Sequence, residues 1–415
     1  MKIGVFTDLH LGIRQYGLEE REEDFYSQYL RAIDTFIENK VDIVICAGDI
    51  FDKARPTPRA LNIFAKGLKK LFKNNINFYN IVGNHSMVQS KSFVTADDFL
   101  YSIQPDDSSY LLLDKDSFFE NEEVFLCGLP YYHNFQLNEF IEEVNKLNEQ
   151  AKGKKCLKIL VLHQAFSEYC GFSGEKLSIN DIDISEFDLI ICGHIHDTKI
   201  TEINENTIYL QPGSLERSSV AEARDEENDG KGVFIFDTDN FSIESISNGF
   251  IRLKSPRKFL IADMYISEKE EVLDIKNEIL ESVNDCSIEP ILFLTVHDTS
   301  QSFDKLINLT KELKSDCLTV HFNYFDESEK DDFGISSIKE IPSPREALKI
   351  ALNPLDDDEA RLGVDLYDNL KNGNDVSKIL EDFFEKRRNK ERELESSFDY
   401  NYDELEELEE FFKNL

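Results

Sequence analysis

Five short segments in the first half of the chain each follow an apolar run and end in residues that bind metal ions. The apolar runs are rich in valine and isoleucine, which is typical of buried strands. The segments are Asp8-Leu9-His10, Gly48-Asp49-Ile50-Phe51-Asp52, Gly83-Asn84-His85, His163-Gln164 and Gly193-His194-Ile195-His196. Because parallel strands end at one edge of a sheet, loops that are far apart in sequence meet there. The pattern therefore predicts a sheet whose loops gather one polar cluster.

Strand and helix patterns alternate along residues 1–250, and this alternation predicts an α/β protein with a layered sheet. Short apolar runs predict strands, and apolar residues three and four apart predict helices. The expected strands are 3–6, 42–46, 77–82, 124–126, 156–162, 189–192, 207–210 and 232–236. The expected helices are about 20–39, 57–74, 95–103 and 136–151.

A second unit is expected after a boundary at Ser255-Pro256-Arg257. Its pattern is strand, helix, strand, helix, strand, which predicts a small α+β domain over 256–325. The expected elements are 259–266, 270–283, 291–296, 303–313 and 318–322. Beyond it we expect a linker at 326–342, a helical segment with apolar faces at 343–390, and an acidic tail at 391–415.

The chain is strongly acidic, with 82 acidic and 46 basic side chains and a formal net charge of −36. Taken alone, this charge argues against a polyanionic partner. It does not exclude one, because a metal site and local basic clusters can hold a phosphate backbone. The basic clusters, each expected to be a solvated face, are Lys66, Lys69, Lys70 and Lys73; Lys152, Lys154, Lys155 and Lys158; and Arg252, Lys254, Arg257 and Lys258.

The seven cysteines are odd in number, and no two have the spacing Cys-x-x-Cys. We interpret them as buried, reduced thiols of a cytoplasmic protein rather than a disulfide or zinc framework. No apolar stretch is long enough to span a bilayer. The first strand pattern begins directly after Met1, so no signal peptide is expected.

The candidate donors are carboxylates, imidazoles and one amide oxygen, a set that suits manganese, iron or zinc better than calcium or magnesium. Two ions need about seven or eight donors, with one carboxylate bridging them. The seven candidates are Asp8, His10, Asp49, Asn84, His163, His194 and His196. Asp49 is the natural bridge, since it is the carboxylate at the end of the second strand. His85 remains free to act as a general acid.

Each motif alone is a weak or moderate signal, whereas all five in this order form a strong one. A single histidine is more often a hydrogen-bonded structural residue than a ligand. We prefer that structural role for His133, His297 and His321. Five of the eight histidines lie in the five segments, so the structural interpretation would there require five coincidences.

The motifs resemble those of the calcineurin-like metallophosphoesterase superfamily. More narrowly, the chain is similar to the archaeal double-strand-break repair nucleases that partner an SMC-like ABC ATPase. The matching stretches are 8–17 with 21–24, Gly48-Asp49-Ile50-Phe51 with Arg55-Pro56, 211–217, and Lys231-Gly232-Val233-Phe234. The resemblance covers residues 1–250 by motif and 251–390 by layout.

This resemblance implies a layered αββα sandwich that holds two manganese ions. Asp8, His10 and His196 would hold the first ion with Asp49. The second would be held by Asn84, His163 and His194, again with Asp49. His85 would protonate the leaving oxygen.

The resemblance also implies the activity and the partners. The expected activities are 3′–5′ exonuclease action on duplex DNA ends and endonuclease action on single strands, in the cytoplasm at the nucleoid. The small domain at 256–325 would cap the DNA, and 343–390 would dock on the coiled coil of the ATPase. The nuclease would be a homodimer, joined by helices near Leu61, Phe64, Phe99 and Leu100.

Two positions depart from common family patterns. Asp52 stands where some members carry a second functional histidine. Ser86 follows His85 where an acidic residue is usual, and this removes a carboxylate that could orient an imidazole or raise its pKa.

Two other functions fit the sequence less well than a nuclease. A protein phosphatase would be expected to show Gly-Asp-x-x-Asp-Arg-Gly, but Lys53-Ala54 follow Asp52. A protein phosphatase or a cyclic-nucleotide phosphodiesterase also leaves the long C-terminal part unexplained. A non-catalytic module that kept the fold should have damaged ligands, whereas every expected ligand is present here.

Overall fold

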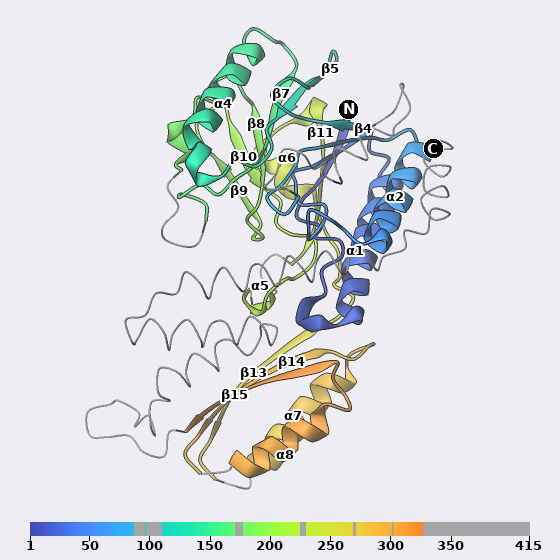
Figure 1. Cartoon of the computed structure of the whole chain (residues 1–415), viewed down its shortest axis with the longest axis vertical. Coiled ribbons are helices and arrows are strands. Elements are labelled where there is room, and N and C mark those ends of the chain that lie inside the picture. The colour runs from blue at the N-terminus through green and yellow to red at the C-terminus, as the bar shows by residue number, and fades with distance from the viewer. Residues whose placement is uncertain are drawn as a thin grey trace, which may run out of the picture.

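The computed structural model describes residues 1–86, 96, 110–170, 177–224, 230–268, 271–300 and 303–326. Two six-stranded sheets lie face to face in the larger unit, and a three-stranded sheet forms a smaller unit (Figure 1). The predicted α/β layered fold is confirmed. The expected helices at 95–103 and 343–390 and the acidic tail lie outside the described residues, apart from Ala96.

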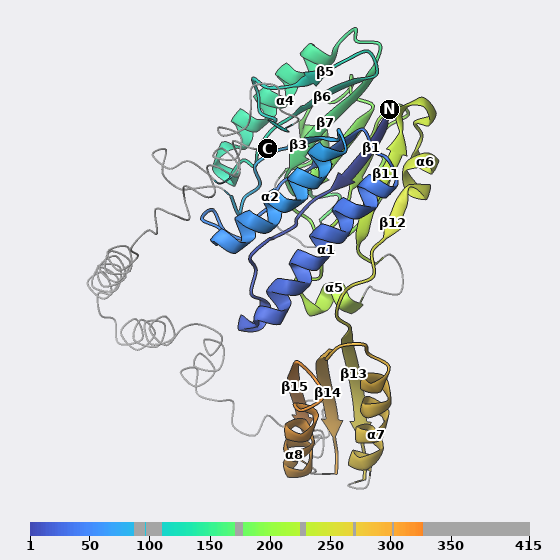
Figure 2. The same cartoon turned by 90° about the vertical axis from the view of Figure 1, so that its right-hand side faces the viewer.

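The first sheet has the strand order β12-β11-β1-β2-β3-β4. Its strands are β1 (Lys2–Phe6), β2 (Ile43–Cys46), β3 (Asn77–Asn80), β4 (Tyr110–Leu112), β11 (Gly232–Asp237) and β12 (Phe250–Arg252). The strands from β1 to β4 pair in parallel, while β11 and β12 add antiparallel strands at one edge. Helices α1 (Glu19–Glu38) and α2 (Pro58–Lys73) pack on the outer face of this sheet (Figure 2).

The second sheet has the order β5-β6-β7-β8-β10-β9. Its strands are β5 (Phe119–Glu120), β6 (Val124–Gly128), β7 (Leu157–His163), β8 (Leu189–Gly193), β9 (Lys199–Glu202) and β10 (Ile208–Gln211). The four central strands are parallel and the two edge strands are antiparallel. Helix α4 (Leu137–Ala151) covers the outer face of this sheet, and α6 (Ile243–Asn248) packs near β9 and β11.

The period-two alternation of strand side chains builds the layers. In β1, Ile3 and Val5 point into the core between the two sheets, while Phe6 packs against the helices on the outer face. Gly4 faces those helices, where an added Cβ would lie 2.6 Å from the ring of Phe36. Each sheet is therefore buried on both faces, which explains why its central strands read as continuous apolar runs.

Phe64 of α2 belongs to this interior. It is fully buried, and its ring lies 5.5 Å from that of Phe51 and 5.7 Å from those of Tyr29 and Phe78, measured between centroids. The Phe64 side chain therefore packs inside the chain, and dimerisation through the helices near Leu61, Phe64, Phe99 and Leu100 stays a prediction. Leu61 is only partly buried, and Phe99 and Leu100 lie outside the described residues.

The smaller unit contains β13 (Phe259–Ile266), α7 (Glu271–Asn284), β14 (Ile291–Asp298), α8 (Phe303–Leu313) and β15 (Thr319–Asp326). All three strands are parallel, and both helices cover one face of the sheet (Figure 2). Strand β15 runs to Asp326, so the predicted linker at 326–342 starts one residue too early. The strand continues because its backbone stays paired with β14 and Phe325 stacks on His297.

Several short strands and helices of the structure could not be predicted from the sequence. The strands β4, β5, β9 and β12 and the helices α5 (Val220–Arg224) and α6 were not expected. Each is too short to show a full period of apolar spacing, and edge strands depend on pairing with a neighbour. All seven cysteines are free thiols. Among the described residues, the helices are too short or too polar to cross a membrane.

Candidate metal centre

The carboxyl ends of strands from both sheets carry the candidate donors. In the first sheet, Asp8 follows β1, Asp49 follows β2 and Asn84 follows β3, whereas His163 ends β7 and His194 follows β8 in the second sheet. The two sheets are joined here by direct contacts. The backbone N–H of His194 donates to Asp8 Oδ2 at 3.1 Å, and His163 Nδ1 donates to the carbonyl oxygen of Ala47 at 2.7 Å. Loops from two sheets thus form one site.

Four candidate ligands have a left-handed backbone, with φ of 51° at Asp8, 44° at His10, 50° at Asp49 and 88° at His194. In the described part of the chain, only three other non-glycine residues do so. Such a conformation costs about 1–3 kcal/mol for a residue with a side chain and clusters at functional sites. The surrounding fold therefore imposes these conformations, and they aim the side chains at one place.

Glycines let these loops approach one another closely. An added Cβ at Gly48 would lie 2.3 Å from His163 Nδ1, and one at Gly83 would lie 2.1 Å from Asp49 Oδ1. Both distances are far below van der Waals contact, so any side chain at either position would displace a candidate ligand. The glycines of the motifs thus serve the packing of the site as well as its turns.

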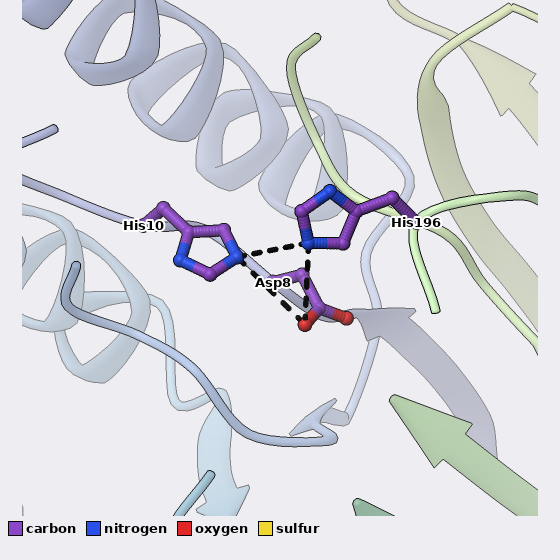
Figure 3. A group of neighbouring side chains, drawn as sticks. All are labelled: Asp8, His10 and His196. Atoms are coloured by element: carbon purple, nitrogen blue, oxygen red, sulfur yellow. Dashed lines mark hydrogen bonds and ion pairs between the residues drawn. The ribbon is translucent and has the colours of Figure 1, made fainter. Parts of the chain in front are cut away.

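Asp8, His10 and His196 form the first group of donors (Figure 3). The Nε2 atoms of His10 and His196 lie 3.0 Å apart, and each is 3.9 Å from Asp8 Oδ1. Asp8 is completely buried and His10 is 2% exposed. The His196 side chain is 25% exposed, so the three converging donor atoms form a suitable corner of a metal coordination sphere that is open on the His196 side.

Asp49, Asn84, His163 and His194 form the second group. His163 Nε2 is 3.2 Å from Asp49 Oδ2 and 3.0 Å from Asn84 Oδ1, and His194 Nδ1 is 2.8 Å from the same amide oxygen. The donor atoms of Asp8, Asp49 and His163 also lie within 4.8 Å of one another, which links the two groups through the carboxylates. All seven predicted donors therefore come together.

His85 lies beside both groups, and its ring forms a third cluster of possible ligand atoms with His10 and Asp52. Its backbone N–H donates to Asp49 Oδ1 at 2.9 Å, and its Nδ1 donates to the carbonyl oxygen of Asp52 at 2.7 Å. The ring lies edge-on to His10, with 4.7 Å between centroids, and the side chain is 40% exposed. Asp52 Oδ1 is 4.0 Å from Nδ1, so the carboxylate at this position adds a negative charge beside the imidazole.

The electrostatics of the site fit a positively charged occupant. Burial lowers the pKa of His10 to about 3 and that of His194 to about 4, which leaves both rings neutral and able to ligate. Burial raises the pKa of Asp8. Burial opposes ionisation of Asp49 too, but the facing His163 outweighs it and lowers the pKa of Asp49, while the pKa of His163 rises to about 9. The lowered pKa of Asp49 shows that this buried carboxylate favours a positive charge beside it, as a metal ion would provide.

Several residues that support His196 were not singled out from the sequence. His196 Nδ1 is 2.9 Å from Ser218 Oγ and 3.2 Å from Glu222 Oε1. Burial opposes ionisation of Glu222, but its bonds to His196 and Lys231 lower its pKa. Ser218 and Glu222 follow no strand and have no motif spacing, so no sequence signal marks them. Lys231 belongs to a stretch that matched the family, without an assigned role.

The three histidines expected to be structural lie outside the donor groups. His297 pairs with Asp263 at 3.3 Å, His321 stacks on Phe293, and His133 stacks on Phe135.

Comparison with known proteins gives relatives that share one name. Residues 1–198 match the family model of the calcineurin-like phosphoesterases. The chain is 32% identical over 298 residues to the DNA double-strand break repair protein Mre11 of Methanococcus maripaludis, covering 70% of this chain and 79% of that protein. Its identity to the protein of the same name from Methanocaldococcus jannaschii is 28% over 389 residues, covering 91% and 97%. For the Thermoplasma acidophilum protein the identity is 30% over 300 residues, covering 70% and 76%.

Proposed function

Because the chain belongs to the family of the DNA double-strand break repair protein Mre11, a family of calcineurin-like phosphoesterases, we propose that it is a manganese-dependent nuclease that processes DNA ends. The observation that carries this proposal is the convergence of seven donor side chains from two sheets. Asp8, His10 and His196 would hold one ion with Asp49 as the bridge. Asn84, His163 and His194 would hold the other with the same bridge.

The donor set favours manganese. It mixes imidazole nitrogen with carboxylate and amide oxygen, which suits manganese better than the oxygen-only ligand sets typical of calcium and magnesium. A pair of such ions polarises the phosphate, lowers the pKa of water and stabilises the charge of the transition state.

His85 is proposed as the general acid. A carbonyl oxygen can only accept, so Nδ1 of His85 must donate to Asp52 and Nε2 is the nitrogen that faces the substrate side. The bond from the backbone of His85 to Asp49 fixes this ring relative to the bridging carboxylate. When the ring is doubly protonated, Nδ1 keeps its proton on the Asp52 carbonyl and Nε2 can deliver its own proton to the oxygen that leaves the phosphate. Ser86 is buried next to His85 and brings no carboxylate to the ring.

We also propose the substrate and the reaction. The activities would be 3′–5′ exonuclease cleavage of duplex ends and endonuclease cleavage of single strands. The domain division supports this role: residues 1–250 would form the nuclease domain and 256–325 a domain that caps the DNA. Arg257, at the junction, pairs with Asp24 of α1 at 2.8 Å, which holds the smaller unit next to the larger one.

Two protein partners are proposed. The segment 343–390, which follows the linker at 326–342 and precedes the tail at 391–415, would dock on the coiled coil of an SMC-like ABC ATPase. A second copy of the chain would pair through the helices near Leu61, Phe64, Phe99 and Leu100. Such a complex would act in the cytoplasm, at the nucleoid.

A cleavage assay tests the proposal. End-labelled duplex and hairpin DNA would be incubated with the full chain in manganese or magnesium, with Asp49→Ala as the matched inactive variant. We expect cleavage in manganese that is lost in the variant. Equal activity of the two proteins, or hydrolysis of phosphoprotein or cyclic nucleotide in place of DNA, would overturn the nuclease assignment.

A further inference from the structure

The short helix α5 (Val220–Arg224) lies at the end of the larger unit that is next to the smaller unit, where it contacts β13 (Figures 1 and 2). One of its side chains, Glu222, points to His196, and another, Ala223, packs against the smaller unit. Neither residue belongs to the donor groups. Through Glu222, the helix therefore contacts His196 on the Nδ1 side of the ring, opposite the Nε2 atom that lies among the donors.

Glu222 is the centre of a compact polar network. Its Oε1 accepts from Ser218 Oγ at 2.6 Å and from the backbone N–H of Ser218 at 3.2 Å, and it lies 3.2 Å from His196 Nδ1. Its side chain is 8% exposed, so these bonds are largely shielded from water. Because Ser218 donates its hydroxyl proton to Glu222, the serine oxygen is left to accept from His196 Nδ1 at 2.9 Å.

Lys231 ties this network to the backbone of the same histidine. Its Nζ lies 2.6 Å from Glu222 Oε2 and donates to the carbonyl oxygen of His196 at 3.0 Å. It also donates to Ser214 Oγ at 2.7 Å, and Ser214 Oγ donates to Glu222 Oε2 at 2.9 Å. The imidazole and the main chain of His196 are thus held by one group of buried residues.

The consequence for metal binding follows from the chemistry of imidazole. Both acceptors face Nδ1, so the proton resides on Nδ1 and the lone pair lies on Nε2. Nε2 is the atom that converges with Asp8 and His10. We infer that Glu222 is a positioning residue, which fixes the tautomer and direction of His196 through the network on α5. Partners of this kind commonly change metal affinity by about 10- to 100-fold when removed.

The smaller unit supports α5 from the other side. Ala223 is buried in a cluster with Phe259 of β13 and Ile291 of β14. The position of Glu222 therefore depends on contacts outside the larger unit. A shift of the smaller unit would therefore change the position of Glu222 and, through it, the orientation of His196.

Manganese binding to the full chain tests the role of Glu222, which rests on the proposed two-ion site. Calorimetric titration and electron paramagnetic resonance would count the bound ions and measure each affinity. In Glu222→Ala we expect one binding event to weaken by about 10- to 100-fold and the other to remain as in the wild type. Glu222→Gln keeps an acceptor oxygen for Nδ1, so we expect it to lose less affinity than Glu222→Ala.

Glu271→Ala is the matched control, because Glu271 accepts hydrogen bonds at the start of α7, away from the donors. We expect both events to be unchanged in this variant. The inference fails if Glu222→Ala binds both ions as tightly as the wild type, or weakens both events equally. If the wild type itself binds no pair of ions, the proposed metal site fails instead, so the two failures are distinguishable.

Discussion

His163 Nε2 lies 3.2 Å from Asp49 Oδ2, and this contact joins the carboxyl ends of two different sheets. Both side chains are almost completely buried. Burial opposes the charge of each, but their attraction keeps the pKa of His163 raised to about 9 and the pKa of Asp49 lowered. A metal ion bound by both residues would replace the proton of His163 and retain the attraction to Asp49.

Manganese should therefore stabilise the folded chain. An ion that binds only the native state adds about 2.7 kcal/mol to the free energy of unfolding when its concentration is 100 times Kd. We expect the melting temperature of the full chain to rise with manganese concentration, and the rise to disappear in Asp49→Ala. A melting temperature independent of manganese in the wild type would contradict the proposed site.

His85→Ala should separate metal binding from cleavage. His85 contacts Asp49 through its backbone, so truncating its side chain leaves the donor groups in place. We expect unchanged manganese affinity and a loss of DNA cleavage by about 10²- to 10⁴-fold, the usual contribution of a general acid. His133→Ala is the matched control, since His133 is exposed and outside the donor groups. Full cleavage by His85→Ala would disprove the assigned role.

Gly83→Ala should disrupt the metal centre by steric displacement. The added Cβ would lie 2.1 Å from Asp49 Oδ1, so this carboxylate, the proposed bridge, must move. We expect manganese affinity to fall by at least about 10-fold, as for other changes that misorient ligands. Gly4→Ala is the control, because its Cβ would meet Phe36 at 2.6 Å, far from the donors. Gly4→Ala should lower the melting temperature without selectively weakening metal binding; equal manganese affinities for the two variants would refute the steric argument.

Two buried arginines at the junction should differ in their effect on stability. Arg21 pairs with Asp24 at 2.6 Å and lies 3.6 Å from Glu216. Arg257 also pairs with Asp24, at 2.8 Å, but it has no ion pair with Glu216 among the described contacts. Arg21→Met removes one of the two guanidinium groups near buried Glu216, together with the bonds of Arg21 to Gln15 and Asp24, and we expect a loss of about 3–5 kcal/mol. Arg257→Met leaves Asp24 paired with Arg21, and we expect about 1.5–3 kcal/mol. Chemical denaturation of both variants measures this order, and the reverse order would contradict the network.

The positions of the candidate metal ligands along the chain could be predicted from the sequence alone. Apolar runs such as 43–46 and 189–193 are local signals of buried strands, and the donors follow them directly. The seven candidate donors and the layered α/β fold could be predicted in this way, because both depend on residue type and short-range periodicity. The buried position of Phe64 could not be predicted, because an apolar helix residue looks the same in sequence whether it faces the core or a partner.

The remaining features of the site depend on long-range contacts, which only the tertiary structure shows. The pairing of Asp49 with His163, the left-handed backbone at Asp8 and the network of Glu222 all join segments that are distant in sequence. Strand β15 likewise extends to Asp326 because β14 lies beside it. Residue type and spacing do not indicate which residues that are distant in sequence become neighbours in the fold. Those neighbours arise when two sheets pack together and bring their loops to a common edge.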